Sequence, residues 1–377
     1  MPKTIAIGAA GLGRAFSLMA RAFGADPRVR LVAGADPRPE ARDRFERDFQ
    51  ARAHADVEQL CKDPAVHVVY IATPHQFHAE QARIAFAHGK HVLVEKPMAL
   101  TAEDCRAMID AARGAGVVLM VGHSHSFDLP ILHTRRLIES QAFGSVRMIT
   151  ALNFTDFLYR PRRPEELDTA RGGGAVYNQA AHQVDVVRLL AGSPVKTVTA
   201  MTGAWDPRRP TEGAYSCLLG FASGAFAALT YGGYGHFDSD EFSGWIGELG
   251  QAKDPTEYRR VRAFENEVEL KNSRNYGGGQ HRPPDAVAHE HFGLVIVSCD
   301  KADLRPQPDG VMIYGDSERR LDSLQAPAIP RREVIDELYG AVVEGRPPLH
   351  GGEWAAATLD VCLAILRSAR EKQTIAL

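Results

Sequence analysis

The chain has 377 residues, of which 45% are hydrophobic and 24% charged, so it can bury a large core and suits two domains. Its formal net charge of −3 gives the molecule no overall attraction to nucleic acid or to an anionic membrane, and we expect neither as a partner. No apolar run approaches the roughly 18 residues of a membrane span.

The cysteines and the first residues bear on the compartment. The five cysteines are scattered and lack Cys-x-x-Cys spacing, which indicates reduced thiols rather than a zinc site or a disulfide framework. The sequence enters an apolar strand directly after Met1-Pro2-Lys3, without the pattern of a signal peptide. We therefore expect a cytoplasmic protein.

A glycine-rich stretch follows the first predicted strand, Thr4–Ile7, and precedes a helical pattern from Arg14 to Phe23. Strand, glycine turn and helix are the context that a dinucleotide fingerprint requires, because glycines permit the tight turn and the helix amino terminus favours a diphosphate. We interpret the spacing as Gly8-x-Ala10-x-x-Gly13. The expected cofactor contacts are Gly8, Ala10, Gly11, Leu12 and Gly13.

The second predicted strand, Arg30–Ala35, ends in Asp36, at the distance expected for the acid that binds the adenosine ribose diol. A carboxylate there disfavours a 2′-phosphate, so NAD is the predicted cofactor. Arg38 lies two residues further on and could soften this preference, which leaves NADP as a less favoured alternative.

Apolar strands continue to alternate with helices up to residue 125. The later strands are Val66–Ala72, His91–Val94 and Val117–Val121, and the helices are Arg38–Phe49, His78–His88 and Ala102–Gly114. This alternation predicts an α/β fold with a doubly wound, Rossmann-type parallel sheet over residues 1–125. The strand ends at Gly8, Asp36, Thr73 and Lys96 would share one edge, with Thr73, Pro74, His75 and His78 as further cofactor contacts.

The strand His91–Val94 stops on Glu95-Lys96-Pro97. Proline fixes the backbone where the strand would continue, and a lysine at the carboxyl end of such a strand faces the crevice in which ligands bind. Taken alone, Lys96 is more simply an exposed lysine at a strand end. His123 and His125 reach the same edge and could contact a polar substrate; no further metal ligands accompany them, so we expect no metal.

A second domain is predicted over residues 126–377. It opens with the alternating strand Val146–Asn153, and further strands are predicted at 196–205, 215–221, 224–231, 292–298 and 311–314. Residues 232–290 are rich in glycine, proline and charge, and we interpret them as a long insertion that serves as a lid or a subunit contact. Helices are predicted at Arg331–Glu344 and Gly352–Glu371, the last of which we expect to pack back on the first domain.

Polar side chains of this domain include a basic loop with Arg160, Arg162 and Arg163, which is either solvated or supplies guanidinium groups to an anionic substrate. Arg171 precedes three glycines and a predicted helix, Ala175–Leu190, that carries Asn178 and His182 on one face. His182 alone could equally be a hydrogen-bonded histidine of the core.

Several of these stretches occur together, and in this order, in a known family. They are Ile71-Ala72-Thr73-Pro74, His78, the run Gly89-Lys90-His91-Val92-Leu93-Val94-Glu95-Lys96-Pro97, and Gly172-Gly173-Gly174 followed by His182 and Asp185. The chain thus resembles the glucose–fructose oxidoreductase and inositol dehydrogenase (Gfo/Idh/MocA) family over nearly its full length. The resemblance implies a carboxy-terminal α/β domain with an open, mainly antiparallel sheet, whose outer face commonly joins subunits into a homodimer or homotetramer.

The resemblance also implies roles for individual residues. Lys96 would be the catalytic lysine, which touches the nicotinamide ribose and the substrate hydroxyl, and His182 its acid/base partner. Glu95 would anchor the ribose or Lys96. The family often has aspartate where this chain has Asn178, and the loss of that carboxylate leaves open whether Lys96 or His182 takes the proton.

Within the family, the stretches Gly172–Asp185 and Phe292–Cys299 and the long insertion are similar to phthalate 4,5-cis-dihydrodiol dehydrogenases. This likeness implies an NAD-dependent oxidation of an aromatic cis-dihydrodiol to a catechol, with Arg160, Arg162, Arg163, Arg171, His123 and His125 as candidate partners of an anionic ring. Two alternatives remain open: a sugar or cyclitol dehydrogenase with the same machinery, and a non-catalytic NAD-binding sensor.

Overall fold

The computed structural model describes residues 4–256, 266–279 and 285–377. The chain divides into two compact units. The first comprises residues 1–123, 266–283 and 329–359, and the second comprises residues 124–265, 284–328 and 360–377. Within the described ranges, no helix combines the length and the apolar character that crossing a membrane requires.

The first unit is built on a six-stranded sheet in which every pair of neighbours is parallel. In spatial order its strands are β3 (Arg52–His54), β2 (Val29–Ala35), β1 (Ile5–Ala10), β4 (Val68–Ile71), β5 (His91–Val94) and β6 (Leu119–Val121). Strands β1 and β4 are buried along their whole length because helices cover both faces. The predicted doubly wound parallel sheet is confirmed.

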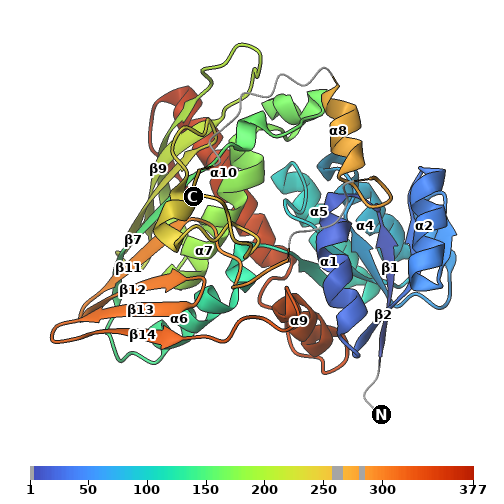
Figure 1. Cartoon of the computed structure of the whole chain (residues 1–377), viewed down its shortest axis with the longest axis horizontal. Coiled ribbons are helices and arrows are strands. Elements are labelled where there is room, and N and C mark those ends of the chain that lie inside the picture. The colour runs from blue at the N-terminus through green and yellow to red at the C-terminus, as the bar shows by residue number, and fades with distance from the viewer. Residues whose placement is uncertain (1–3, 257–265, 280–284) are drawn as a thin grey trace. The chain divides into compact units, whose positions relative to one another are not determined.

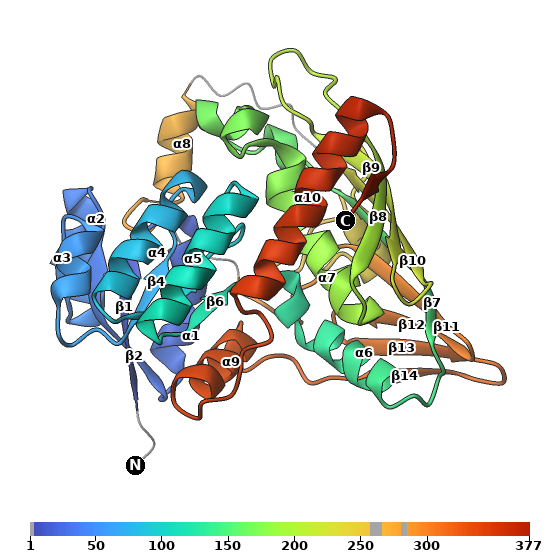
Figure 2. The same ribbon diagram turned by 180° about the vertical axis from the view of Figure 1, so that it is seen from behind.

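Helices α1 (Arg14–Ala25), α2 (Pro39–Phe49) and α9 (Arg332–Val342) lie on one face of this sheet (Figure 1). Helices α3 (Val57–Lys62), α4 (His78–Ala87) and α5 (Ala102–Ala115) lie on the other (Figure 2). Local sequence explains several ends: Asp56 and Thr101 cap α3 and α5 through their side chains, and Gly116 ends α5 in the left-handed conformation. An ion pair of 2.6 Å between Arg28 and Asp336 ties α9 to the start of the sheet.

The structure changes the register of the glycine turn. Strand β1 runs three residues beyond the predicted Ile7, to Ala10, so Gly8 and Ala10 lie inside the strand. A Cβ on Gly8 would come within 3.0 Å of Leu60 and Val66, which gives this glycine a packing role. The turn itself is Gly11-Leu12-Gly13. The predicted placement of Gly8 at a strand end is wrong, because Ala9 and Ala10 continue the buried strand as readily as the preceding apolar residues do.

The second unit is built on a nine-stranded sheet in which only the pairing of β7 with β10 is parallel. In spatial order its strands are β14 (Arg319–Ser323), β13 (Gly310–Gly315), β12 (Ala302–Gln307), β11 (Leu294–Cys299), β7 (Val146–Phe154), β10 (Phe226–Gly232), β9 (Ala214–Phe221), β8 (Val195–Gly203) and β15 (Ile375–Ala376). The predicted open, mainly antiparallel sheet is confirmed.

Helices α6 (Leu129–Glu139) and α7 (Ala181–Ala191) pack on one face of this sheet, together with the later part of α10 (Gly352–Glu371) (Figure 2). A π-helical turn, Val176–Ala180, leads directly into α7. Single helical turns occur at His75–Phe77, His125–Phe127, Phe157–Tyr159, Pro164–Leu167, Thr169–Arg171 and Ser239–Ser243.

The predicted insertion, 232–290, is divided between the two units. Residues 266–279, which include helix α8 (Glu267–Ser273), belong to the first unit, and residues 233–256 and 285–290 belong to the second. Residues 257–265 and 280–284 of the predicted insertion lie outside the described residues. The middle of the insertion is therefore part of the Rossmann-type unit, although it lies far along the chain.

Candidate active site

The turn after β1 has the features of a diphosphate cradle. Gly11 has a φ of +87°, and a Cβ there would lie 2.8 Å from the carbonyl oxygen of Ala72. Gly13 starts α1 without a side-chain cap, and the first turn of that helix has no acidic residue. The backbone N–H groups of a helix start that nothing caps favour an anionic group, so these residues fit the diphosphate of a dinucleotide.

Asp36 lies against this turn. Its carboxylate accepts a hydrogen bond of 2.8 Å from the backbone N–H of Leu12 and forms an ion pair with Arg38 at 2.9 Å. Arg38 also donates to the carbonyl oxygen of Leu12, at 2.7 Å. The acid and its neighbouring guanidinium group, predicted to have opposing effects on cofactor choice, thus form one bonded pair at the turn.

The loop after β4 meets the loop after β5 through His78. This ring is fully buried, with its two nitrogens 2.9 Å from the carbonyl oxygens of Thr73 and Pro97. Only a protonated ring could donate to both carbonyls, whereas burial lowers the pKa of His78, so at neutral pH one contact is a donated hydrogen bond. His78, which we predict to contact the cofactor, also fixes the backbone that carries Lys96. The Thr73 hydroxyl is also engaged, by Gln81 at 2.6 Å.

Lys96 is half-buried and follows a buried carboxyl group. Glu95 accepts a 2.5 Å hydrogen bond from the Tyr70 hydroxyl. Burial raises the pKa of Glu95 and outweighs the opposite effects of the Tyr70 hydrogen bond and of the positive charges of Arg331 and Lys96. Glu95 therefore links the end of strand β5 to Tyr70 of strand β4, directly before the predicted catalytic lysine, Lys96.

His182 lies at the start of α7 in the second unit, where it is buried among polar and aromatic groups. Its Nδ1 is 3.5 Å from the Ser124 hydroxyl, and its ring centroid lies 4.7 Å from that of His125 and 4.9 Å from that of Phe292. One turn on, Asp185 accepts a hydrogen bond from the Ser126 hydroxyl. The segment 124–126 therefore lines the side of α7 that carries His182.

His125 forms a buried pair with Asp128, in which Nδ1 and the carboxylate are 2.7 Å apart. Burial opposes a charge on this imidazole, but the negative charges of Asp128, and further those of Glu290 and Glu248, raise the pKa of His125. A cationic ring is thus favoured in direct contact with His182.

Asn178 lies in the π-helical turn, and its side-chain amide donates to the carbonyl oxygens of Gly174, at 2.8 Å, and Gly172, at 3.3 Å. An aspartate could not donate either bond. The departure from the family pattern at this position therefore matches the local backbone, in which the glycine turn points its carbonyl groups at residue 178.

The four arginines predicted to meet an anionic substrate have different surroundings. Arg160 pairs with Asp156 at 2.9 Å and with Glu248 at 3.4 Å. Arg162 lies 3.8 Å above the Phe157 ring and donates to the carbonyl oxygen of Phe157 at 2.6 Å, and burial lowers its pKa to about 10. Both hold the loop in shape. Arg163 is half-buried and Arg171 is exposed.

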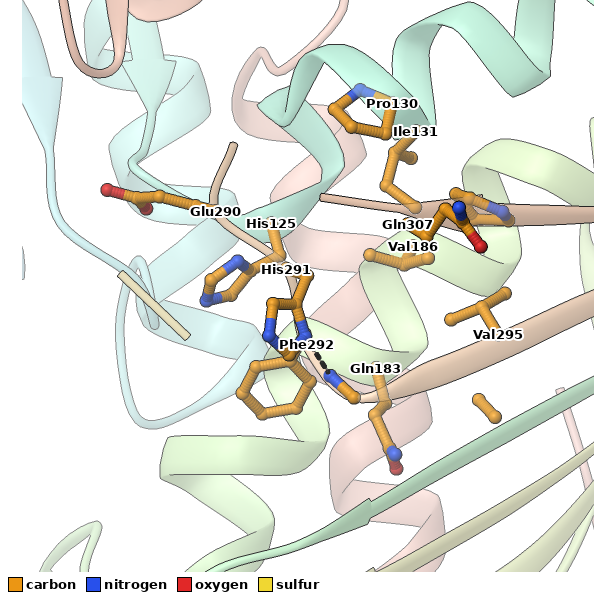
Figure 3. A pocket seen from close by; sticks show the side chains of 13 residues that line it. His125, Pro130, Ile131, Gln183, Val186, Glu290, His291, Phe292, Val295 and Gln307 are labelled. Atoms are coloured by element: carbon orange, nitrogen blue, oxygen red, sulfur yellow. Dashed lines mark hydrogen bonds between the residues drawn. The ribbon is translucent and has the colours of Figure 1, made fainter. Parts of the chain in front are cut away.

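A cavity of about 20 Å³ lies beside His125 in the second unit (Figure 3). Its walls are mainly apolar side chains, with Gln183 and Gln307 among the polar ones: His125, Ile131, Gln183, Val186, Phe292 and Gln307. That volume accommodates about one water molecule. The cavity is too small for a substrate ring, and it belongs to the packing behind His125.

The structure also reveals site residues that the sequence did not predict. Tyr70, Ser124, Asp128 and Phe292 all contact predicted residues. Ser124 stands between two singled-out histidines, which is a signal that a closer reading could have used. Tyr70 carries no local signal. Phe292 begins a stretch that we quoted for the family likeness, but nothing local places it beside His182, because the two meet only through the fold.

Comparison with known proteins agrees with this arrangement. The model of the oxidoreductase family with an NAD-binding Rossmann fold matches residues 5–123, and that of the GFO/IDH/MocA C-terminal domain matches residues 131–249. A 1-carboxy-3-chloro-3,4-dihydroxycyclohexa-1,5-diene dehydrogenase of Comamonas testosteroni is 49% identical over 97% of this chain and 94% of its own.

Solved structures extend the comparison. A protein described as a dehydrogenase from Bordetella bronchiseptica RB50 superposes with a TM-score of 0.94 at 40% identity, over 99% of this chain and 100% of its own. A levoglucosan dehydrogenase in complex with NADH and levoglucosan, at 19% identity over 99% of each chain and a TM-score of 0.77, shares the fold. The predicted resemblance and the prediction of a dehydrogenase are confirmed: this chain belongs to the Gfo/Idh/MocA oxidoreductase family.

Proposed function

We propose that this protein oxidises a carboxylated cyclohexadiene cis-diol to the corresponding catechol with NAD⁺. The observation that carries this proposal is the 49% identity, over 97% of the chain, to a dehydrogenase named for a carboxylated dihydroxycyclohexadiene. The phthalate 4,5-dihydrodiol, with two carboxylates, and a ring with a single carboxylate are the two forms of substrate to be distinguished.

In the proposed reaction, the C–H bond of one carbinol breaks and its hydride goes to NAD⁺, while the hydroxyl proton goes to the protein. The resulting hydroxydienone is a tautomer of the catechol: the second carbinol carbon loses its proton and the ketone oxygen gains one, so the sum is diol and NAD⁺ giving catechol, NADH and a proton. NAD⁺ supplies the hydride acceptor. Lys96 and His182 share the proton transfer.

His125 supports recognition of a carboxylate. Among the predicted cationic partners, it is the residue found in ring contact with His182, and its pairing with Asp128 favours the charged form. Arg160 and Arg162 are held by protein groups, so we propose His125, His123, Arg163 and Arg171 as the more direct partners of the anion.

The test is a screen for NADH formation with a benzoate-type dihydrodiol, the phthalate 4,5-dihydrodiol, an unsubstituted benzene dihydrodiol, inositols and aldoses. We expect the carboxylated diols to give the highest kcat/KM and the unsubstituted diol a lower one. High activity on sugars or cyclitols, without activity on the diols, would overturn the proposed substrate class. No turnover of any compound, with NAD still bound, would favour a sensor.

The same screen, run with NAD⁺ and NADP⁺, tests the cofactor. We propose that NAD is preferred, because the Asp36 carboxylate lies at the turn, and that NADP is tolerated through Arg38, which already lies within 3.1 Å of that carboxylate. A kcat/KM that is higher with NADP⁺ would contradict this preference.

The outer face of the nine-stranded sheet supports a further proposal, that the protein is a homodimer or homotetramer in a cytoplasmic setting. Met201, Leu218, Phe226 and Met148 lie on four adjacent strands and are 80%, 55%, 48% and 36% exposed. An apolar patch on a sheet face is typical of an interface. The five cysteines are free thiols, as suits a reducing compartment. The molar mass in solution, by light scattering, tests the assembly, and a monomer would contradict it.

A further inference from the structure

Residues 266–279 of the first unit pass beside the dinucleotide turn, although they lie more than 250 positions after Gly13 in the sequence. Figure 1 shows helix α8 next to α1 and α2. Gly277, with a φ of +87°, lets the backbone approach α2 so closely that a Cβ there would be 3.2 Å from the α-carbon of Ala41. The segment thus covers the region between the starts of α1 and α2, where the predicted diphosphate and ribose contacts lie.

Tyr276 anchors this segment. Its ring is 4% exposed and meets that of Phe16 edge-on, with the centroids 5.1 Å apart, and Phe49 at 6.2 Å. Its hydroxyl donates to Asp48 at 2.7 Å. An aromatic ring that is buried and hydrogen-bonded in this way fixes the backbone on either side of it.

Asn275, directly before this anchor, is 5% exposed. Its Oδ1 lies 4.0 Å from the position that a Cβ on Gly13 would occupy. The Asn275 side chain is thus largely enclosed beside the start of α1, within reach of a group bound at the turn Gly11–Gly13. A buried amide that points at the cap of α1 is suited to a ligand group that would sit there.

Positive charge gathers at the same place. Arg14 is the first residue of α1, Arg274 precedes Asn275, and Arg331 precedes α9. Burial, together with the positive charges of Arg274 and Arg331, lowers the pKa of Arg14. Like charges that repel one another in a partly buried site are stabilised by an anion between them.

We propose that Asn275 donates a hydrogen bond to the diphosphate of the bound dinucleotide, and that Tyr276 anchors residues 266–279 as a clamp on the cofactor. The middle of the predicted insertion thereby acquires a function in cofactor binding. This inference rests on the NAD-binding fold and is independent of the proposed substrate.

The test is direct binding of NAD⁺, measured by calorimetry without any substrate, so its outcome is separable from that of the activity screen. Asn275→Asp keeps the size of the side chain and places a negative charge beside the diphosphate, and we expect Kd to rise about tenfold or more. Asn275→Ala should raise Kd about fivefold. The matched control is Val268→Ala on the exposed side of α8, where Val268 is 42% exposed and Kd should not change.

Fragments of NAD⁺ show which part of the cofactor Asn275 contacts. ADP-ribose retains the diphosphate and should weaken in parallel with NAD⁺ in Asn275→Asp, whereas adenosine, used as a competitor, should bind as before. The anchor is tested by Tyr276→Ala, which should raise Kd for NAD⁺, and by Tyr276→Phe, which keeps the ring and should bind almost normally. Unchanged affinity in both Asn275 variants, or an equal loss for adenosine, would overturn the proposal.

Discussion

Two buried carboxyl groups, Glu95 in the first unit and Glu248 in the second, have pKa values that are shifted in opposite directions. In the first unit, burial raises the pKa of Glu95, whose polar neighbours are one tyrosine hydroxyl and more distant cations. In the second unit, burial also opposes the charge of Glu248, but the positive charges of Arg160, His125 and His291 prevail and lower its pKa. Little positive charge thus compensates Glu95, whereas Glu248 belongs to an ionic network that includes His125, the neighbour of His182.

The largest expected effect is the loss of turnover on replacement of Lys96, the residue that follows Glu95. Lys96→Met should leave the Kd for NAD⁺ within about twofold and lower turnover by at least about a hundredfold, because a proton acceptor at the strand end is lost. Steady-state kinetics and calorimetry measure the two quantities. The control is Lys301→Met at an exposed position of the second unit, and near-normal turnover of Lys96→Met would end the assignment.

The corresponding change in the second unit is His182→Gln, which keeps a polar group against Ser124 and Phe292. We expect turnover to fall about ten- to a hundredfold, with NAD⁺ binding unchanged. The pH profile of kcat separates a proton carrier from a core histidine: loss of one limb of the profile indicates the carrier, and a profile of unchanged shape contradicts it.

A new carboxyl group tests whether the network of the second unit extends to the glycine turn. Asn178→Asp would turn two donated hydrogen bonds into contacts between a carboxylate and carbonyl oxygens, and should destabilise the fold by about 2 kcal/mol at neutral pH. The loss should shrink in acid, where the protonated group can donate one bond. Denaturant unfolding measures it, with Asn178→Ser as the neutral comparison. If the loss of stability does not depend on pH, the new carboxylate stays charged in acid, which would indicate that the cations of the second unit lower its pKa.

The smallest effects test the comparison itself. Relative to Glu248→Gln, the wild type should be more stable by about 1 kcal/mol at neutral pH, since Arg160 is partly exposed. Because the folded pKa of Glu248 is lowered, this advantage is present above its ordinary pKa and is lost as pH falls through the folded value. Glu95→Gln should behave in the opposite sense: the folded pKa of Glu95 is raised, so the wild type loses stability relative to this variant as pH rises through it. Pairs of unfolding curves from acid to neutral pH would show both signs, and equal signs would refute the comparison.

The sequence predicted local features well. The strand His91–Val94 and its stop at Lys96-Pro97 were predicted at the bounds observed, because a short apolar run and a proline define them locally. The glycine turn was misplaced by three residues, since nothing local separates Ala9-Ala10 from a turn. Strands β12 and β14 were not predicted because they alternate charged and apolar residues, and Pro306 lies inside β12.

The site was predictable only in part, for a different reason. Lys96 and His182 stand in recognisable stretches, but Ser124 contacts His182 across 58 positions of sequence. Asn275 follows strand β10 of the second unit in the chain, yet its side chain lies near Gly13 of the first unit. Such partners depend on which elements pack together. No pattern in a single sequence specifies that pairing.

The division of the chain has a consequence for its synthesis. Each unit consists of three separate segments, so the chain passes between the units five times. The first 123 residues leave the ribosome without helix α9, whose Asp336 pairs with Arg28 and whose Tyr339 ring lies beneath that guanidinium group, at 5.5 Å. The Rossmann-type unit is complete only when residue 359 has been made. A nascent chain shorter than this exposes one flank of α1, and no single cut in the gene releases either unit intact.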